Sequence, residues 1–135
     1  MTSGYSGTPL PKKLGITSGS RVLLIGAPEG YDETLGPLPE GVEFAKRAGA
    51  TVGLVQLFAT RRADLASRLA TLRRQLAPDA VIWVSWPKRA SGVATDITED
   101  TIREVAFPLG LVDIKVCAVD ATWSGLKLVV RKALR

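Results

Sequence analysis

The stretch RVLLIG, residues 21–26, is a short apolar run that follows the polar residues TSGS and ends at Gly26. Two further runs have the same character, TVGLVQLFAT at 51–60 and AVIWVSW at 80–86. Short, continuous apolar runs without polar alternation are typical of strands that are buried on both faces of a parallel sheet. The three runs therefore predict a parallel central sheet, and they decide the fold class.

The segments after the second and third runs predict helices. Leucines between the second and third runs are spaced four, three and four residues apart, at Leu65, Leu69, Leu72 and Leu76. This spacing places them on one face of a helix of about four turns. Asp96 and Glu99 have the spacing of a capping box, which predicts a helix over 97–107. The stretch GVEFAKRAG, 41–49, is interpreted as about two further helical turns.

The last third of the chain changes to an alternating pattern. LVDIKVCAV, 111–119, is expected to turn Val112, Ile114, Val116 and Ala118 inward, with Asp113, Lys115 and Cys117 on the other side. GLKLVVRK, 125–132, alternates in the same way, and the connection between the two is short enough for an antiparallel hairpin. The prediction is therefore an α/β fold: a Rossmann-like three-layer sandwich with three parallel central strands and a C-terminal antiparallel hairpin.

Length and composition favour one small domain. The chain has 135 residues and a hydrophobic content of 46%, so residues 1–135 are expected to form a single Rossmann-like domain. Residues 1–14 are expected to be an extended N-terminal arm that packs through Leu10 and Leu14. The sequence has no apolar run of the roughly 20 residues that a membrane span needs and no secretory signal pattern. A cytoplasmic protein without membrane contact is the expectation.

The chain contains no histidine, which excludes Ser-His and Cys-His catalytic arrangements and histidine-based zinc sites. Cys117 is the only cysteine, so no disulfide can form within the chain, and its strand-like setting favours a buried role. No catalytic residue, no metal ligand and no cofactor are assigned. The formal net charge is +5, and residues 61–135 carry the whole excess with thirteen basic and eight acidic side chains.

Four of these cations follow two of the predicted strands. Ligands of open parallel sheets bind beyond the carboxyl ends of the strands, and arginine binds phosphate or carboxylate groups in a bidentate manner. We call Arg61, Arg62, Lys88 and Arg89 the basic rim and predict that it faces an anion. The full set of expected ligand-binding residues is Gly26, Glu29, Gly30, Thr60, Arg61, Arg62, Lys88, Arg89, Ser91 and Gly92.

Three other interpretations compete with an anion site at the basic rim. Its cations could instead pair with the acidic residues of 29–43 and clamp that connection over the sheet. Dinucleotide binding at GAPEGYD, 26–32, is disfavoured because the loop lacks the G-x-G-x-x-G pattern and Pro28 removes a backbone donor. Nucleic-acid binding is disfavoured because Trp83 and Trp86 are three residues apart on a strand, so they face opposite sides and form no continuous stacking surface.

Several stretches resemble a known family. The segments RVLLIGAPEGYDETLGPLPEGVE at 21–43, WPKRASG at 86–92 and LVDIKVCAVDATWSGLK at 111–127 are similar to the family catalogued as domain of unknown function 3052, which comprises short actinobacterial proteins. This resemblance covers nearly the whole chain and implies no transferable activity. The order of elements also resembles a shortened class I methyltransferase, which implies a Rossmann-like sheet. The loop GAPEGYD and the short span from Gly26 to Thr51 depart from that pattern where the adenosyl group would be held.

The sequence therefore leads to one hypothesis and two alternatives. The hypothesis is a non-catalytic Rossmann-like binding domain whose basic rim meets an anionic small molecule or an acidic protein surface. The first alternative is a small methyltransferase-like enzyme that uses a nucleotide-type cofactor at GAPEGYD. The second is a homodimeric interaction module that pairs through the exposed edge of the C-terminal hairpin.

Overall fold

The three apolar runs form strands, as predicted, and helices lie between several of the strands along the chain. The computed structural model describes residues 7–135. The strands are β1 (Arg21–Ile25), β2 (Glu43–Phe44), β3 (Leu54–Phe58), β4 (Val81–Pro87), β5 (Leu111–Ala118) and β6 (Trp123–Val130). The helices are α1 (Leu10–Leu14), α2 (Tyr31–Leu35), α3 (Arg62–Gln75) and α4 (Glu99–Ala106), and the short 3-10 turns are η1 (Arg89–Ser91), η2 (Phe107–Leu109) and η3 (Lys132–Leu134).

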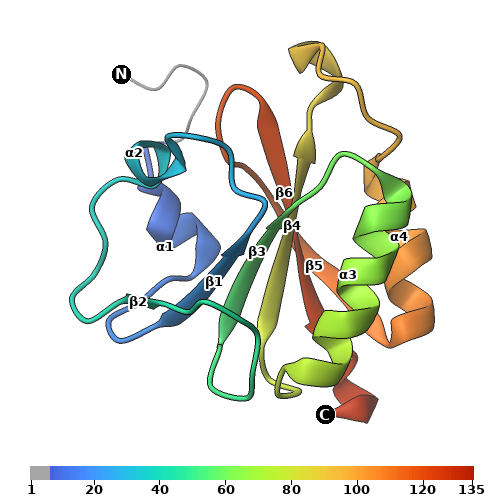
Figure 1. Cartoon of the computed structure of the whole chain (residues 1–135), viewed down its shortest axis with the longest axis horizontal. Coiled ribbons are helices and arrows are strands. Elements are labelled where there is room, and N and C mark those ends of the chain that lie inside the picture. Colours follow the sequence, from blue (N-terminus) through green and yellow to red (C-terminus); the bar gives the residue numbers. More distant parts are fainter. Residues whose placement is uncertain (1–6) are drawn as a thin grey trace.

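The strands form one mixed sheet in the order β2-β1-β3-β4-β6-β5 (Figure 1). Neighbours from β2 to β4 pair in parallel, whereas β6 is antiparallel to both β4 and β5. The second strand of the hairpin, β6, lies next to β4 and buries its alternate residues Leu126, Leu128 and Val130. The predicted α/β fold with three parallel central strands and a C-terminal antiparallel hairpin is confirmed, and β2 adds a short fourth parallel strand.

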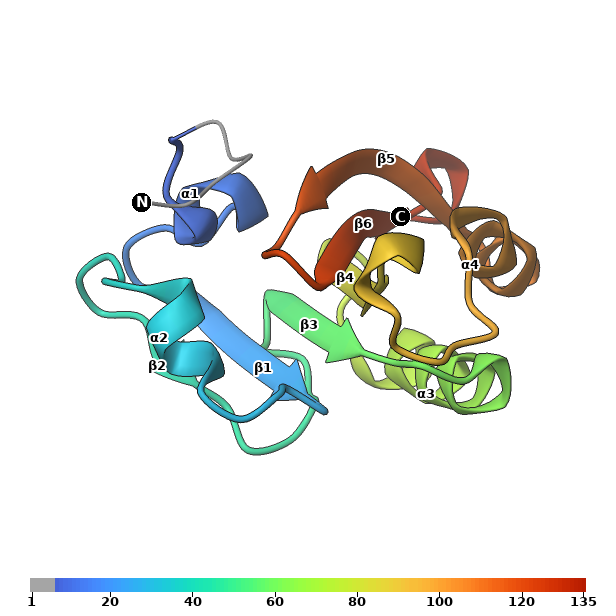
Figure 2. The ribbon, with the colours of Figure 1, turned by 90° about the horizontal axis from the view of Figure 1, so that it is seen from above.

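Helices cover both faces of the sheet, which gives three layers (Figures 1 and 2). The leucine stripe of α3 (Leu65, Leu69, Leu72 and Leu76) is buried in the core on one face, together with residues of α4. The second core, on the other face, contains Leu10, Leu14 and Tyr31 from α1 and α2. Trp83 belongs to this second core and Trp86 to the first, so the two rings lie on opposite faces of β4 as the strand period requires.

The end of the N-terminal segment is a helix and not part of an extended arm. Residues 10–14 form α1, which ends at Gly15 with a φ of 84°. Leu10 and Leu14 are buried as expected, and the Trp83 indole N–H donates to the carbonyl of Leu14 at 2.8 Å. The extended arm is therefore wrong for residues 10–14, because a short amphipathic turn buries both leucines at once. Residues 1–6 of the predicted arm lie outside the described part of the chain.

The helical interpretation of 41–49 is also wrong. Glu43 and Phe44 form β2, and the amide of Ala45 donates to the carbonyl of Val22 at 2.7 Å. The Arg21 guanidinium also forms an ion pair with Glu43 at 3.1 Å. This segment gains backbone hydrogen bonds by pairing with the open edge of β1. A two-turn helix between Gly41 and Gly49 would not form more of them.

The hairpin has a register irregularity that the alternating pattern did not predict. A β-bulge lies between Asp113 and Lys115. Ile114 and Val116 were expected to point inward, but they are 56% and 53% exposed on the edge strand. A bulge inserts one extra residue and so changes which side chains face the core. No helix in the described part of the chain is long and apolar enough to cross a membrane.

Candidate functional site

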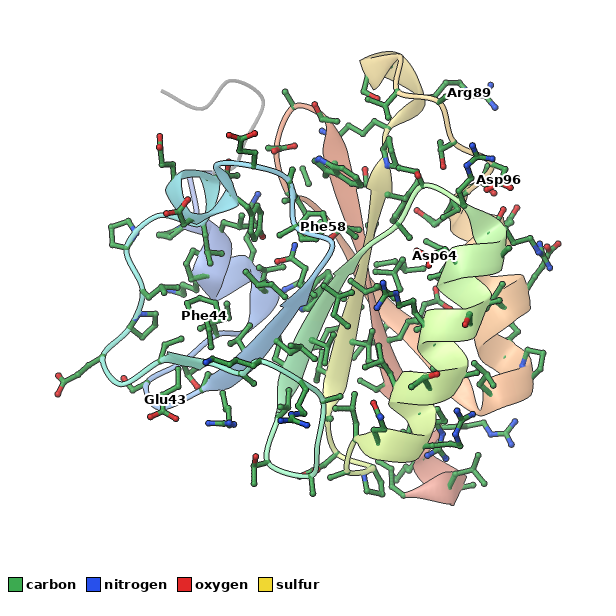
Figure 3. The ribbon with its side chains drawn as sticks, in the orientation of Figure 1. Glu43, Phe44, Phe58, Asp64, Arg89 and Asp96 are labelled. Atoms are coloured by element: carbon green, nitrogen blue, oxygen red, sulfur yellow. The ribbon has the colours of Figure 1, made fainter. Side chains whose placement is uncertain are left out.

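The ten predicted ligand-binding residues lie at the carboxyl ends of β1, β3 and β4. Gly26 follows β1, Thr60 and Arg61 connect β3 to α3, and Lys88 precedes η1 after β4. In Figure 3, Arg89 and Asp96 lie at the same end of the molecule as the start of α3. Parallel strands that run side by side bring their ends to one edge of the sheet, so the structure gathers these residues at one end of the molecule.

Two cations of the basic rim make contacts within the protein. Arg62 forms an ion pair with Glu104 of α4 at 2.6 Å between Nη1 and Oε1. The Lys88 ammonium donates to the carbonyl of Asp120 at 2.7 Å. Neither contact reaches the acidic stretch 29–43, so the predicted clamp is wrong for Arg62. Arg61 and Arg89 are exposed and form no ion pair with the residues that the structure describes.

The N-terminus of α3 is already closed by a carboxylate. Asp96 accepts a hydrogen bond from the backbone N–H of Arg62 at 2.6 Å, and the Thr95 hydroxyl donates to the carbonyl of Thr60 at 2.7 Å. The loop before α4 therefore lies over the end of β3. A helix N-terminus is the usual place for a bound anion, and here the protein's own carboxylate occupies that place.

This use of Asp96 corrects the predicted capping box. The box at the start of α4 is formed by Thr98 and Thr101, whose side chains and backbone N–H groups bond each other reciprocally. Asp96 lies two residues before that cap, in the loop that crosses to α3. The helix itself, Glu99–Ala106, lies within the predicted range 97–107.

The loop after β1 leads directly into a buried aromatic residue. Gly26 has a φ of 70°, and the chain enters α2 at Gly30 with a φ of 77°. The Tyr31 ring is 3% exposed and packs edge-on against Phe58, with ring centroids 4.8 Å apart. Its hydroxyl donates to Gln56 at 2.5 Å. Burial raises the pKa of the Tyr31 phenol above its ordinary value, which keeps this side chain neutral and in place.

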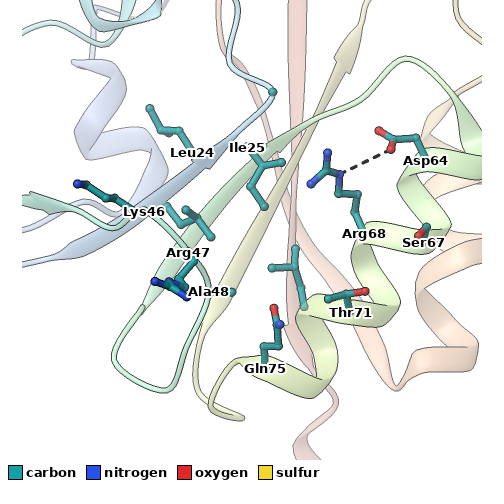
Figure 4. Close-up of a pocket in the computed structure, with 13 residues that line it drawn as sticks. Leu24, Ile25, Lys46, Arg47, Ala48, Asp64, Ser67, Arg68, Thr71 and Gln75 are labelled. Carbon is teal, nitrogen blue, oxygen red and sulfur yellow. Dashed lines mark ion pairs between the residues drawn. The ribbon is translucent and has the colours of Figure 1, made fainter.

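A broad cleft opens on the other face of β1. We call it the β1–α3 groove; its volume is about 710 Å³. Its lining residues are Leu23, Leu24, Ile25 and Gly26 from β1 and its end, Lys46, Arg47 and Ala48 after β2, and Asp64, Ser67, Arg68, Thr71, Leu72 and Gln75 from α3. Figure 4 shows α3 on one side of the groove and the 46–48 segment on the other. Of the predicted ligand-binding residues, Gly26 alone lines the groove.

The groove carries more positive than negative charge. Arg68 and Asp64 form a long ion pair of 3.6 Å, and their side chains are 51% and 53% exposed. Lys46 and Arg47 are exposed and have no ion-pair partner within residues 7–135. An exposed pair of this kind contributes under about 1 kcal/mol, so the Arg68 guanidinium is available to a stronger acceptor. Three cations against one carboxylate make the groove suited to an acidic occupant.

The sequence analysis missed this groove, although two of its signals are visible in the sequence. The pair Lys46-Arg47 stands out after an acidic stretch. On α3, the polar residues Asp64, Arg68, Thr71 and Gln75 each precede a residue of the leucine stripe by one position. Residues one position apart on a helix are rotated by about 100°, so a polar stripe had to run beside the buried one. The sequence alone did not indicate that this stripe faces an uncovered strand.

A second cleft lies beside η1. Its volume is about 450 Å³, and Trp86, Arg89, Thr95 and Glu99 are among its lining residues. It shares no lining residue with the β1–α3 groove. The predicted ligand-binding residues are therefore divided: they lie at one end of the sheet, but Gly26 and Arg89 line different clefts.

Cys117, the acidic side chains and Trp83 offer little for chemistry. Burial raises the pKa of the Cys117 thiol, so its reactive thiolate form is disfavoured. Within residues 7–135, no three of the Cys, Asp and Glu side chains lie together in a way that could hold a metal ion. The Trp83 indole is fully buried, so this ring is not exposed for base stacking.

Comparisons with known proteins give a family and a fold. The family model described as "Protein of unknown function (DUF3052)" matches residues 45–132. No curated protein matches the sequence. Similar solved structures include a SAM-dependent methyltransferase from Aquifex aeolicus, with 16% identity, a TM-score of 0.64, and coverage of 90% of this chain and 88% of that one.

Two further methyltransferase-fold structures extend this likeness. Aeropyrum pernix fibrillarin, solved with natively bound S-adenosyl-L-methionine, has 14% identity and a TM-score of 0.57, with 93% of this chain and 70% of that one covered. The N-methyltransferase NodS from Bradyrhizobium japonicum has 12% identity and a TM-score of 0.56, with 95% and 100% covered. At these identities the likeness shows the fold alone, and it confirms the expected methyltransferase-like, Rossmann-like sheet.

Proposed function

The chain belongs to the family of unknown function DUF3052, and we propose that this member is a non-catalytic binding domain that holds an acidic partner in the β1–α3 groove. One observation carries the proposal: the β1–α3 groove, a cleft of about 710 Å³, has Lys46, Arg47 and Arg68 against the single carboxylate of Asp64. A positively charged cleft concentrates anionic partners and raises their association rate.

The basic rim keeps a secondary place in this proposal. Arg61 and Arg89 remain candidates for contact with an anion, because both are exposed. Arg62 and Lys88 are weaker candidates, since each already has an acceptor within the protein. The closure of the α3 N-terminus by Asp96 further favours the groove as the place where an acidic partner binds.

The methyltransferase-like alternative has less support from the site. A nucleotide-type cofactor would need room and backbone donors after β1. There the loop contains Pro28, and the next helix turns Tyr31 onto Phe58. The likeness to S-adenosylmethionine-binding proteins concerns the fold, which hosts many functions.

Nuclear magnetic resonance titration tests the proposal. Poly-L-glutamate at low salt is expected to shift the backbone amides of Ile25, Arg68 and Thr71, and added salt should weaken the effect because exposed charges are screened. Arg47→Ala combined with Arg68→Ala should weaken binding by about tenfold or more, which corresponds to about 1.4 kcal/mol. Arg74→Ala combined with Arg131→Ala is the matched control, because both residues are exposed and lie outside the groove.

The same titration with S-adenosylmethionine separates the two functions. We expect no saturable shift around Gly26 and Tyr31. Saturable binding there that survives loss of Arg47 and Arg68 would support the enzyme and contradict the proposal. An absence of polyglutamate shifts in the groove would also contradict it.

A further inference from the structure

The helical layer on one face of the sheet ends before it reaches β1. On this face α3 and α4 cover β3, β4 and β6, whose residues share one buried core with both helices. Leu23 and Ile25 of β1 face the same side. In the view from above, no helix lies over β1 on the side of α3 (Figure 2). The β1–α3 groove is therefore a strip of sheet beside α3 that no helix of the described chain covers.

The wall formed by α3 is long and mostly polar. Its lining residues run from Asp64 to Gln75, and the eleven steps between these two residues extend over about 16 Å, or three turns. Ser67 and Thr71 have short side chains, which allow a neighbouring backbone to approach closely, as helices packed 8–10 Å apart require. Arg68 and Gln75 add hydrogen-bonding groups along the same line. This shape fits a rod that lies alongside α3.

An extended peptide fits the groove less well than a helix does. The carbonyl of Arg21 accepts from Gly53 before β3, whereas the carbonyl of Val22 accepts from Ala45 after β2. Backbone groups alternate in direction along a strand, so beyond Val22 only Leu24 turns both its N–H and its C=O to the outer edge of β1. Strand addition relies on a row of such groups, and one residue provides too few.

A small phosphate compound also fits less well. Phosphate sites use clustered backbone N–H groups at a helix N-terminus. At the start of α3, the N–H of Arg62 already donates to Asp96. The groove instead offers side-chain cations on two walls, Lys46 and Arg47 on one and Arg68 on the other, with the half-buried apolar side chains of Ile25 and Ala48 beside them. This order of charged, apolar and charged groups matches a helix with one apolar face and acidic flanks.

We propose that the β1–α3 groove binds an acidic amphipathic helix of a partner protein, laid alongside α3. The inference rests on the proposed function and names the partner of the same site. The apolar face of the helix would contact Ile25 and Ala48, and its carboxylates would meet Arg47 and Arg68. Helix-in-groove recognition of this kind uses apolar anchors at i, i+3, i+4 and i+7.

Three synthetic peptides test the inference on the full chain. The first carries leucine at i, i+3, i+4 and i+7 with glutamate on both flanks; the second has the same composition in an order that removes the apolar face; the third has lysine in place of glutamate. The first should bind at least tenfold more tightly than the other two, gain helical circular dichroism on binding, and shift the amides of Ile25 and Thr71.

Two variants place the peptide in the groove. Ser67 is exposed on α3, and Ser67→Trp would fill the adjacent part of the groove with a large side chain. This variant should weaken binding of the first peptide by at least tenfold. Arg47→Ala with Arg68→Ala should do the same, while Arg74→Ala with Arg131→Ala should change the affinity less than twofold. Thermal unfolding of each variant shows whether it is folded.

The possible results separate the inference from the proposed function. Equal binding of the first two peptides at the groove would overturn the helical partner and leave an acidic partner supported. Failure of polyglutamate and of every acidic peptide to bind would overturn both. Amide shifts confined to Arg61 and Arg89 would move the site to the basic rim and overturn the groove as the docking surface.

Discussion

At the scale of single residues, Gly26 combines a left-handed backbone with a close approach to the backbone of Phe58. Its φ of 70° is in the left-handed region, and a Cβ there would lie 2.9 Å from the carbonyl oxygen of Phe58. Gly30 has a similar φ of 77° but open space around it. Substitutions at Gly26 and Gly30 therefore separate the cost of the left-handed conformation from the cost of the close contact with Phe58.

We expect Gly26→Ala to destabilise the protein by about 2–4 kcal/mol, the sum of about 1–2 kcal/mol for the left-handed conformation and a similar amount for the close contact. Gly30→Ala should cost only about 1–2 kcal/mol. Urea unfolding of both variants at pH 7 measures the difference. Equal losses would show that contact with Phe58 is relieved without cost.

Tyr31 is the residue whose burial should appear in the pH dependence of stability. Its hydroxyl donates to Gln56, and the Gln56 amide donates to Ser85 at 3.1 Å, all within the core. Tyr31→Phe would leave the Gln56 oxygen without this donor. The expected loss is about 1–3 kcal/mol in the free energy of unfolding at pH 7.

This loss should shrink above pH 10. The pKa of Tyr31 is raised in the folded protein by burial, while the unfolded phenol ionises near its ordinary value of about 10. Above that pH the unfolded chain releases a proton that the folded chain retains, so the stability of the wild type falls with pH. Tyr31→Phe lacks this contribution. Unfolding curves at pH 7, 9 and 11 test the effect, and a constant difference between the two proteins would contradict it.

At the scale of elements, α3 depends on a distant residue for its N-terminal cap. Arg61 occupies the cap position but provides no side-chain acceptor. Asp96, 34 positions along the chain, supplies the carboxylate to Arg62. The cap therefore connects the loop before α4 to the start of α3. Because α3 begins shortly after β3, the same contact holds both helices near the end of that strand.

Asp96→Ala should cost about 0.5–2 kcal/mol, the usual loss for a capping residue. Asp96→Asn keeps an acceptor and should cost less. Amide hydrogen exchange locates the effect: exchange in the first turn of α3 should accelerate in the alanine variant while the amides of α4, which has its own cap at Thr98, keep their protection. Equal acceleration in both helices would point to a general loss of stability instead.

The edge strand β5 shows how one inserted residue changes an element. Alternation from Val112 onward predicts inward Ile114 and Val116, yet the bulge after Asp113 turns them out. Arg103 of α4 contacts Asp113 at 3.1 Å, which connects the strand to the helix at that point. The exposed pair lies on an edge strand, where the bulge and Lys115 work against pairing with another sheet. Dimerisation through this edge stays a prediction.

At the scale of the whole molecule, the uneven helical cover of the sheet determines where a partner could bind. Helices α3 and α4 leave β1 open on their face, while α1 and α2 cover it on the other (Figure 2). The basic surplus of the chain reaches this opening through Lys46, Arg47 and Arg68. The peptide and polyglutamate titrations belong to this scale, because the groove exists only where three separate segments meet.

The sequence by itself determined five of the six strands, the helices α3 and α4, and the end of the sheet where the charged residues gather. Those features follow from local periodicity, since a buried strand or an amphipathic helix is encoded within a dozen residues. Only the tertiary structure decided that Asp96 caps α3, that Tyr31 packs on Phe58, and that the polar stripe of α3 faces an uncovered strand. Each of these depends on contacts between segments far apart in the chain, and residue spacing within one segment carries no information about them.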